Sequence, residues 1–173
     1  MQWMPPGTSA LQRCRQAWNT AACCVRKALA AQLVFETAAQ AAEYLVGTEG
    51  NILLATGAKE LAAFAGLEPA RLYPRVLPTP EGIAACAAAN VPRRNIIAMQ
   101  GPFSLALNKA LITQFQIRYL VTKDGGAAGG FAEKVQAAAD TGAQLVVLRR
   151  PPETGETETQ ILAYCKEILQ WSH

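Results

Sequence analysis

Histidine is almost missing from this sequence, because His173, the last of 173 residues, is the only one. Ser-His-Asp triads, Cys-His pairs and His-rich zinc sites each need an imidazole at a fixed position. A chain end is rarely held firmly enough to provide one. The sequence therefore argues against triad hydrolases, Cys-His nucleophiles and zinc catalysis, and we expect no metal site.

Long apolar runs, long basic runs and closely spaced cysteine pairs are missing too. No uninterrupted apolar stretch reaches about 18 residues, the length of a membrane-spanning helix, so we expect no membrane partner. The net charge of +3 comes without a Lys/Arg run, which is too weak to indicate nucleic acid but suits an anionic small molecule. The five cysteines form no CxxC pair. That spacing favours reduced thiols and a cytoplasmic protein.

What the sequence does contain is an alternation of short apolar segments with Ala-rich segments, which predicts parallel βα units. The expected strands are apolar on both faces, as is typical of strands covered by helices on each side. They span residues 51–56, 71–77, 95–100, 118–123 and 144–150, with 32–37 as a sixth candidate. Helices are expected at 38–46, 58–66, 80–89, 103–115, 130–141 and 157–170. The predicted fold is therefore α/β, a Rossmann-like parallel sheet of about five strands flanked by helices.

The first thirty residues differ from the rest. They hold three of the five cysteines, and no strand and loop precede their helical pattern. We find no chemistry in them and expect a leader or a covering helix. The expected division is therefore 1–30 and an α/β domain at 31–173.

In an open parallel sheet, ligands bind beyond the carboxyl ends of the strands. In the loop at 56–59, Thr56 and Lys59 offer a hydroxyl and a cation, and Gly57 allows close approach of a ligand; routine turn chemistry explains them equally well. In the loop at 99–104, Gln100 needs a polar partner at a strand end, whereas Ser104 can simply cap the next helix. Both interpretations stay open for each loop.

The segment "KDGGAAGG" at 123–130 follows a predicted strand and precedes a predicted helix. It has the form GGxxGG, with Ala127 where the dinucleotide fingerprint GxGxxG has its second glycine. Lys123 can neutralise a phosphate or a carboxylate. About twenty residues further on, Arg149 and Arg150 are of the type that accepts a 2′-phosphate, although a solvated strand end explains them as well. A phosphate cradle and a flexible turn both remain possible here.

Four segments, "LLATGAKELAAF", "YPRVLPTPEGIAAC", "IIAMQGPFS" and "LVTKDGG", resemble the C-terminal part of precorrin-6A reductases, a family of cobalamin biosynthesis. The resemblance runs from about residue 40 to 152 in consistent order. It implies an NADPH-dependent reduction of one double bond in a precorrin macrocycle, or in its cobalt-containing analogue. The substrate that it implies is an anionic tetrapyrrole.

The resemblance also implies roles for individual residues, transferred by position. The substrate side comprises Thr56, Gly57, Lys59, Arg75, Gln100, Gly101, Pro102, Phe103 and Ser104, with the cations as partners for carboxylates. The cofactor side comprises Thr122, Lys123, Gly125, Gly126, Arg149 and Arg150. No proton donor is identified.

One departure from the family concerns the first forty residues. The family begins with a "GGT" glycine loop after its first strand, associated with the dinucleotide, and this sequence has no counterpart to it. Three explanations stay open: a fragment that lacks the dinucleotide half, a wrongly assigned start, and a reading-frame error upstream. The alternatives are a non-catalytic α/β module that binds a tetrapyrrole or phosphate anion, and an unrelated domain whose glycines serve turns only.

Overall fold

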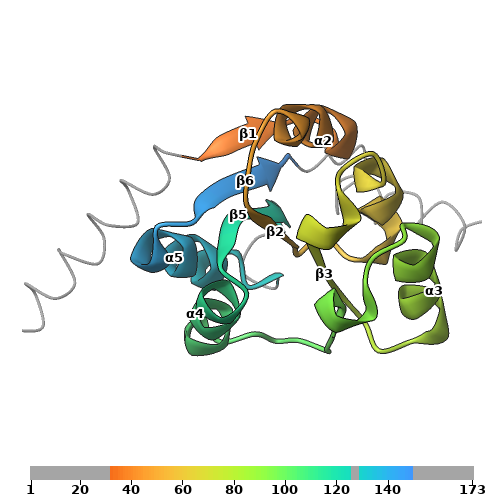
Figure 1. Ribbon diagram of the computed structural model, residues 1–173. Coiled ribbons are helices and arrows are strands. Elements are labelled where there is room, and N and C mark those ends of the chain that lie inside the picture. Colours follow the sequence, from red (N-terminus) through yellow and green to blue (C-terminus); the bar gives the residue numbers. More distant parts are fainter. Residues whose placement is uncertain (1–31, 126–128, 150–173) are drawn as a thin grey trace, which may run out of the picture.

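The computed structural model describes residues 32–125 and 129–149. Its strands form one parallel sheet in the order β1-β6-β5-β2-β3-β4 (Figure 1). Their bounds are β1 Leu33–Phe35, β2 Asn51–Leu54, β3 Leu72–Val76, β4 Ile97–Ala98, β5 Ile117–Lys123 and β6 Gln144–Leu148. The predicted parallel α/β fold is confirmed, and the sixth candidate strand is present as β1.

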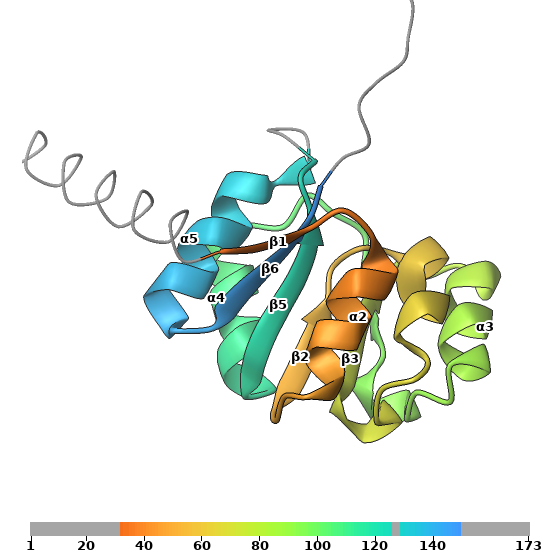
Figure 2. The same cartoon turned by 90° about the horizontal axis from the view of Figure 1, so that it is seen from above.

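Helices cover both faces of the sheet (Figure 2). One face carries α2 (Ala38–Val46), η1 (Ala58–Phe64) and α3 (Pro80–Ala88), and the other carries α4 (Leu105–Gln114) and α5 (Phe131–Thr141). Two short 3-10 turns, η2 (Pro69–Arg71) and η3 (Arg93–Asn95), precede β3 and β4. The helix predicted at 58–66 is present as η1, which is a 3-10 helix, and its first residue follows Gly57, which offers no side chain as a cap.

Successive residues of each central strand enter different cores. In β2, Ile52 and Leu54 pack in the core under α2, η1 and α3, whereas Leu53 packs in the core under α4 and α5. In β5, Val121 packs in the core under α2, η1 and α3, and Leu120 packs in the core under α4 and α5. A strand buried on both faces needs apolar residues at every position, which explains why the central strands are continuous apolar runs.

Side-chain caps set the starts of three helices. Thr37 accepts a hydrogen bond from the Gln40 N–H at the start of α2, and Thr79 accepts one from the Gly82 N–H at the start of α3. Ser104 accepts one from the Leu107 N–H, 3.2 Å away, at the start of α4. Each such cap contributes about 1 kcal/mol. The capping role considered for Ser104 is therefore confirmed.

Three predicted segments differ from the structure or lie outside it. The strand expected at 95–100 is reduced to Ile97–Ala98, because Asn95 ends the turn η3 and donates its Nδ2–H to the Ala70 carbonyl, 2.9 Å away. The helix expected at 157–170 and the segment 1–30 fall outside the described residues. In the part of the chain that is described, no helix is both long and apolar enough to cross a membrane.

Candidate functional site

The sheet has a topological switch point between β2 and β5. These strands are neighbours, with Leu54 opposite Val121. After β2 the chain turns to the face that carries η1, and after β5 it turns to the face that carries α5. Loops that part in this way leave a crevice beyond the carboxyl ends of the strands, which is the usual ligand site of such sheets.

Thr56 and Lys123 stand at this crevice. Thr56 follows β2, and its Oγ1 is buried without a hydrogen-bond partner among the described residues. Lys123 ends β5, and its Nζ donates to Glu60 Oε1 at 2.8 Å, which joins the loop after β5 to η1. A buried hydroxyl without a partner is uncommon and calls for a ligand or water as its missing partner. The two strands that flank the crevice therefore bring a buried, unpartnered hydroxyl and a partly exposed cation to their carboxyl ends.

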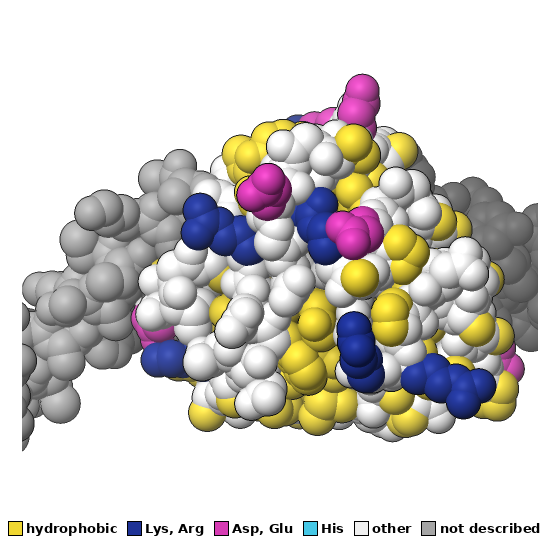
Figure 3. All heavy atoms as spheres, viewed as in Figure 1, with side chains coloured by type: hydrophobic (Ala, Val, Ile, Leu, Met, Phe, Trp, Pro, Cys, Tyr) yellow, Lys and Arg dark blue, Asp and Glu magenta, His cyan; other side chains and the backbone are white. Residues whose placement is uncertain are grey.

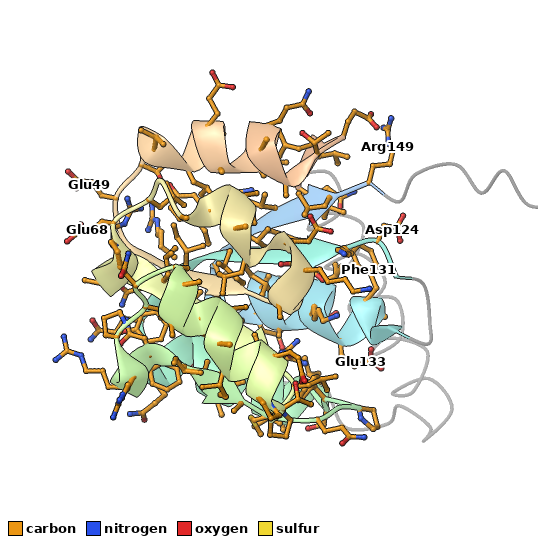
Figure 4. All side chains as sticks on the ribbon, turned by 90° about the vertical axis from the view of Figure 1, so that its right-hand side faces the viewer. Glu49, Glu68, Asp124, Phe131, Glu133 and Arg149 are labelled. Carbon is orange, nitrogen blue, oxygen red and sulfur yellow. The ribbon has the colours of Figure 1, made fainter. Side chains whose placement is uncertain are left out.

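A cavity of about 510 Å³ lies beside this crevice, beyond the ends of β5, β6 and β1. It is lined by Glu36, Thr37, Ala38, Glu60, Lys123, Asp124, Gly125, Leu148 and Arg149. The Arg149 guanidinium is paired with Glu36, so both cations of this cavity already have a carboxylate partner. Figure 4 shows four side chains along this edge of the sheet: Asp124, Phe131, Glu133 and Arg149.

A second cavity, of about 540 Å³, lies between the 99–104 loop and the start of α5. Its lining combines three residues of the predicted substrate side with the end of the glycine segment: Gly101, Pro102, Phe103, Gly129, Gly130 and Lys134. The two loops approach each other closely, because a Cβ added to Gly130 would lie 4.0 Å from the Phe103 carbonyl oxygen. The structure thus brings together two segments that the sequence analysis treated separately.

Arg75 lies within β3 and is buried, with 5% of its surface exposed. Its Nη1 donates to Asn108 Oδ1 at 2.9 Å, and its guanidinium stands over the Phe103 ring, 3.9 Å from the centroid. Burial lowers the pKa of Arg75 to about 10, because the charged form loses water. Arg75 therefore lies behind Phe103, at the wall of the second cavity.

Lys134 and Asn108 are two residues of this region that the sequence analysis missed. Lys134 is only 8% exposed, and its Nζ donates to the Gly129 carbonyl at 2.6 Å. Desolvation lowers its pKa, the charge of Arg75 lowers it further, and Glu133 acts in the opposite direction. The signal was present in the sequence, since 131, 134, 135 and 138 share one face of a helix and three of these residues are apolar.

The remaining predicted residues are spread along the same edge of the sheet. Gln100 and Lys59 are exposed and make no side-chain hydrogen bond to any described residue. Thr122 is buried and donates to the Lys123 carbonyl at 3.3 Å, while Gly57 adopts a φ of 85°, which favours glycine. Gly126 and Arg150 lie outside the described residues.

The described residues contain no cluster of ligands suited to a metal ion. On the face shown in Figure 3, the Lys and Arg side chains are scattered among apolar and acidic ones and form no continuous basic surface.

Comparison with known proteins decides the family. Residues 7–173 match the model of the family described as precorrin-6x reductase CbiJ/CobK. The chain belongs to this family. The precorrin-6x reductase match includes residues 7–30, which the sequence analysis set apart from the α/β domain.

Curated relatives of this chain agree with the family match. A cobalt-precorrin-6A reductase of Priestia megaterium is 36% identical over 116 residues, which is 65% of this chain and 46% of the relative. One of Salmonella typhimurium is 38% identical over 126 residues, covering 70% and 48%. A precorrin-6A reductase of Rhodococcus erythropolis is 34% identical over 122 residues, covering 70% and 46%. The chain spans about half the length of the curated relatives it matches.

A solved structure described as CobK precorrin-6A reductase has a similar fold. The TM-score is 0.59 at 22% identity, over 79% of this chain and 55% of that one. At this identity the likeness supports the fold alone.

Proposed function

We propose that this chain is the substrate-side half of a precorrin-6A reductase of cobalamin biosynthesis, which reduces one double bond of a precorrin with NADPH. The observation that carries the proposal is the crevice between β2 and β5, whose flanking strands are followed by the buried, unpartnered Thr56 hydroxyl on one side and end in the cation Lys123 on the other. Family membership and the polycarboxylate nature of a precorrin support it. Charge-assisted hydrogen bonds to carboxylates are the strong polar contacts of such a site.

The proposed function assigns a role in substrate or cofactor binding to each of these residues. Lys123 and Lys59 bind carboxylate arms of the macrocycle, Thr56 donates a hydrogen bond, and Gly101 to Ser104 shape the wall against which the ring lies. NADPH supplies the hydride when bound, and the edge formed by Thr122, Gly125 and Arg149 is the part of this chain that would face it. Arg149 and Lys123 are each paired with a glutamate, so an anionic ligand must replace Glu36 or Glu60 there.

Separate titrations with precorrin-6A and with NADPH test this function. We expect the chain to bind precorrin-6A without NADPH, and to oxidise NADPH in its presence once mixed with the dinucleotide half of a relative. Binding of precorrin-6A without any NADPH oxidation in that mixture would favour a non-catalytic tetrapyrrole-binding module. The proposal fails if precorrin-6A does not bind in either setting.

Replacing Thr56 with valine separates a ligand-binding hydroxyl from a structural one. Because Thr56 Oγ1 has no partner in the described structure, the free energy of unfolding should change by less than about 0.5 kcal/mol. The affinity for precorrin-6A should fall about 5- to 10-fold, as expected when one hydrogen bond is lost. Chemical denaturation and calorimetric titration measure the two quantities. A drop in stability without a drop in affinity would show that the hydroxyl is structural.

Replacing Glu60 with glutamine should strengthen precorrin-6A binding. Glu60 and Lys123 form a partly exposed ion pair, 2.8 Å apart, and such pairs contribute at most about 1 kcal/mol. Release of Lys123 from this competitor should raise the affinity by up to about 5-fold. The gain should vanish when Lys123 is changed to methionine as well. An affinity unchanged by Glu60→Gln at low ionic strength would contradict a role for Lys123 in binding carboxylates.

A further inference from the structure

Arg75 and Lys134 are buried cations without an acidic partner. Their hydrogen-bond acceptors are neutral, Asn108 Oδ1 for Arg75 and the Gly129 carbonyl for Lys134. The ion pairs found within residues 32–125 and 129–149 involve other cations. Burying a charge is costly unless the charge is paired, and a neutral acceptor compensates only part of this cost. The ligand-free chain therefore carries an uncompensated positive charge in its interior.

The placement of Lys134 adds to this charge. Lys134 is the fourth residue of α5, close to the positive end of the helix dipole, where a cation is disfavoured. The charge of Arg75 also acts against it, lowering the pKa of Lys134. Glu133 is the one neighbour that favours the charged form, yet its side chain is exposed at the edge of the sheet (Figure 4). A bound anion would offset both unfavourable effects at once.

An open space adjoins these cations. The second cavity, of about 540 Å³, is lined by Lys134 and by Phe103, whose ring stacks on the Arg75 guanidinium. Gly130 begins α5 with a φ of 60° and offers no side-chain cap, so the first N–H groups of the helix remain available to a ligand. Gly101 leaves room for the Phe103 ring, because a Cβ there would lie 3.1 Å from it.

We propose that Lys134 and the start of α5 form a binding site for one oxyanion, a carboxylate or a phosphate group, and that the charge of Arg75, behind the Phe103 ring, adds to the attraction. Asn108 is a positioning residue in this site: it holds Arg75 beside the cavity through a neutral oxygen and leaves the charge of Arg75 for the ligand. The site does not depend on the proposed function. Only the source of the oxyanion, which we assign to a carboxylate arm of precorrin-6A, rests on that function.

Lys134→Met, with inorganic phosphate as the probe, tests the site. We expect the ligand-free variant to melt about 2 to 4 °C above the unchanged chain, because a buried charge is removed and the carbonyl of the exposed Gly129 can accept a hydrogen bond from water instead. Phosphate affinity should fall about 10- to 100-fold, the loss of a charge-assisted hydrogen bond. A lower melting temperature with unchanged phosphate binding would show that Lys134 is a structural donor to Gly129 and would overturn the proposal.

Two controls make the result specific. Lys109→Met removes an exposed lysine, paired with Asp140 at 2.9 Å, and should leave phosphate binding unchanged. Sodium chloride at matched ionic strength should not reproduce the phosphate effect, since screening alone acts on exposed charges. In the unchanged chain, the NMR signal of the Lys134 Nζ or Cε should shift on addition of phosphate. No shift would overturn the proposal without any variant.

Competition experiments identify the source of the oxyanion. If the source is a carboxylate arm, precorrin-6A should displace phosphate from the unchanged chain and bind Lys134→Met about 10-fold more weakly. Displacement by NADPH alone would assign the site to a cofactor phosphate. If phosphate binds at Lys134 but precorrin-6A does not bind at all, the proposed function is refuted. The proposed oxyanion site would still stand. If precorrin-6A binds the unchanged chain and Lys134→Met equally well, and phosphate does not affect this binding, the proposed oxyanion site is refuted. The proposed function would still stand.

Discussion

The variant Gly82→Ala is expected to lose about 2 to 3 kcal/mol of unfolding free energy, the cost of a steric clash that cannot be relieved locally. A Cβ at position 82 would lie 2.5 Å from the Leu77 carbonyl oxygen, a backbone atom. Gly82 also donates its N–H to the capping Thr79 at the start of α3. Relief of the clash must therefore move the start of α3 away from the loop that precedes it. Urea denaturation followed by circular dichroism measures the loss.

Gly66→Ala is the matched control for this variant. A Cβ at Gly66 would meet no atom within 4 Å, so the free energy of unfolding should change by less than about 0.5 kcal/mol. Equal losses of unfolding free energy in Gly82→Ala and Gly66→Ala would mean that the clash with the Leu77 carbonyl oxygen is not the cause of the loss.

The variant Asn108→Ala is expected to lose about 3 kcal/mol of unfolding free energy, because it removes the partner of the buried Arg75 guanidinium and of the Phe103 carbonyl, whereas the Ser104 carbonyl still accepts from the backbone N–H of residue 108. Asn108 is fully buried; its Oδ1 accepts from Arg75, and its Nδ2 donates to the Phe103 and Ser104 carbonyls at 3.3 and 2.9 Å. The Arg75 guanidinium accounts for the largest part of the loss, since a buried charge without an acceptor is especially costly. Urea denaturation provides the measurement.

Gln114→Ala, at an exposed position of the same helix, controls for the change in side-chain size and should cost less than about 0.5 kcal/mol. The larger loss should also shrink at high phosphate concentration, if the anion holds Arg75 in place of Asn108. A loss of less than 1 kcal/mol of unfolding free energy in Asn108→Ala would show that water takes the place of the Asn108 side chain. The hydrogen-bond network around Arg75 would then be open to solvent.

Much of the fold was predictable because its signals are local. Residues 52–54 and 119–121 are apolar at every position, and Ser104 caps its helix as the sequence suggests. The type of η1 was not predictable, because the Ala-rich segment 58–64 has good α-helix formers and its 3-10 geometry is fixed by packing against α2 and α3. Tertiary packing overrides helix propensity in such cases.

The loops of the site were predictable, but their partners were not. Loops at the carboxyl ends of parallel strands follow from the fold class, so Thr56, Gln100 and Lys123 could be identified. The pairing of Lys123 with Glu60 joins residues 63 positions apart, and that of Arg75 with Asn108 joins residues 33 apart. Contacts of that kind depend on strand order, which no local pattern encodes. Lys134 escaped notice because a lysine on an otherwise apolar helix face is usually assumed to reach solvent.

The strand order has a consequence for handling this protein. β1, the first described strand, pairs with β6, the last, and the Arg149 N–H continues the ladder to the Phe35 carbonyl at 2.8 Å. The short strand β1 thus forms this edge of the sheet through contacts between residues more than 110 positions apart, the type of contact that forms slowly. Any shortened form that begins after Phe35 would leave the apolar β6 as an open edge, with its N–H and C=O groups free to pair with other molecules. The three residues of β1, Leu33–Phe35, therefore cover the edge of β6 and protect the protein against edge-to-edge aggregation.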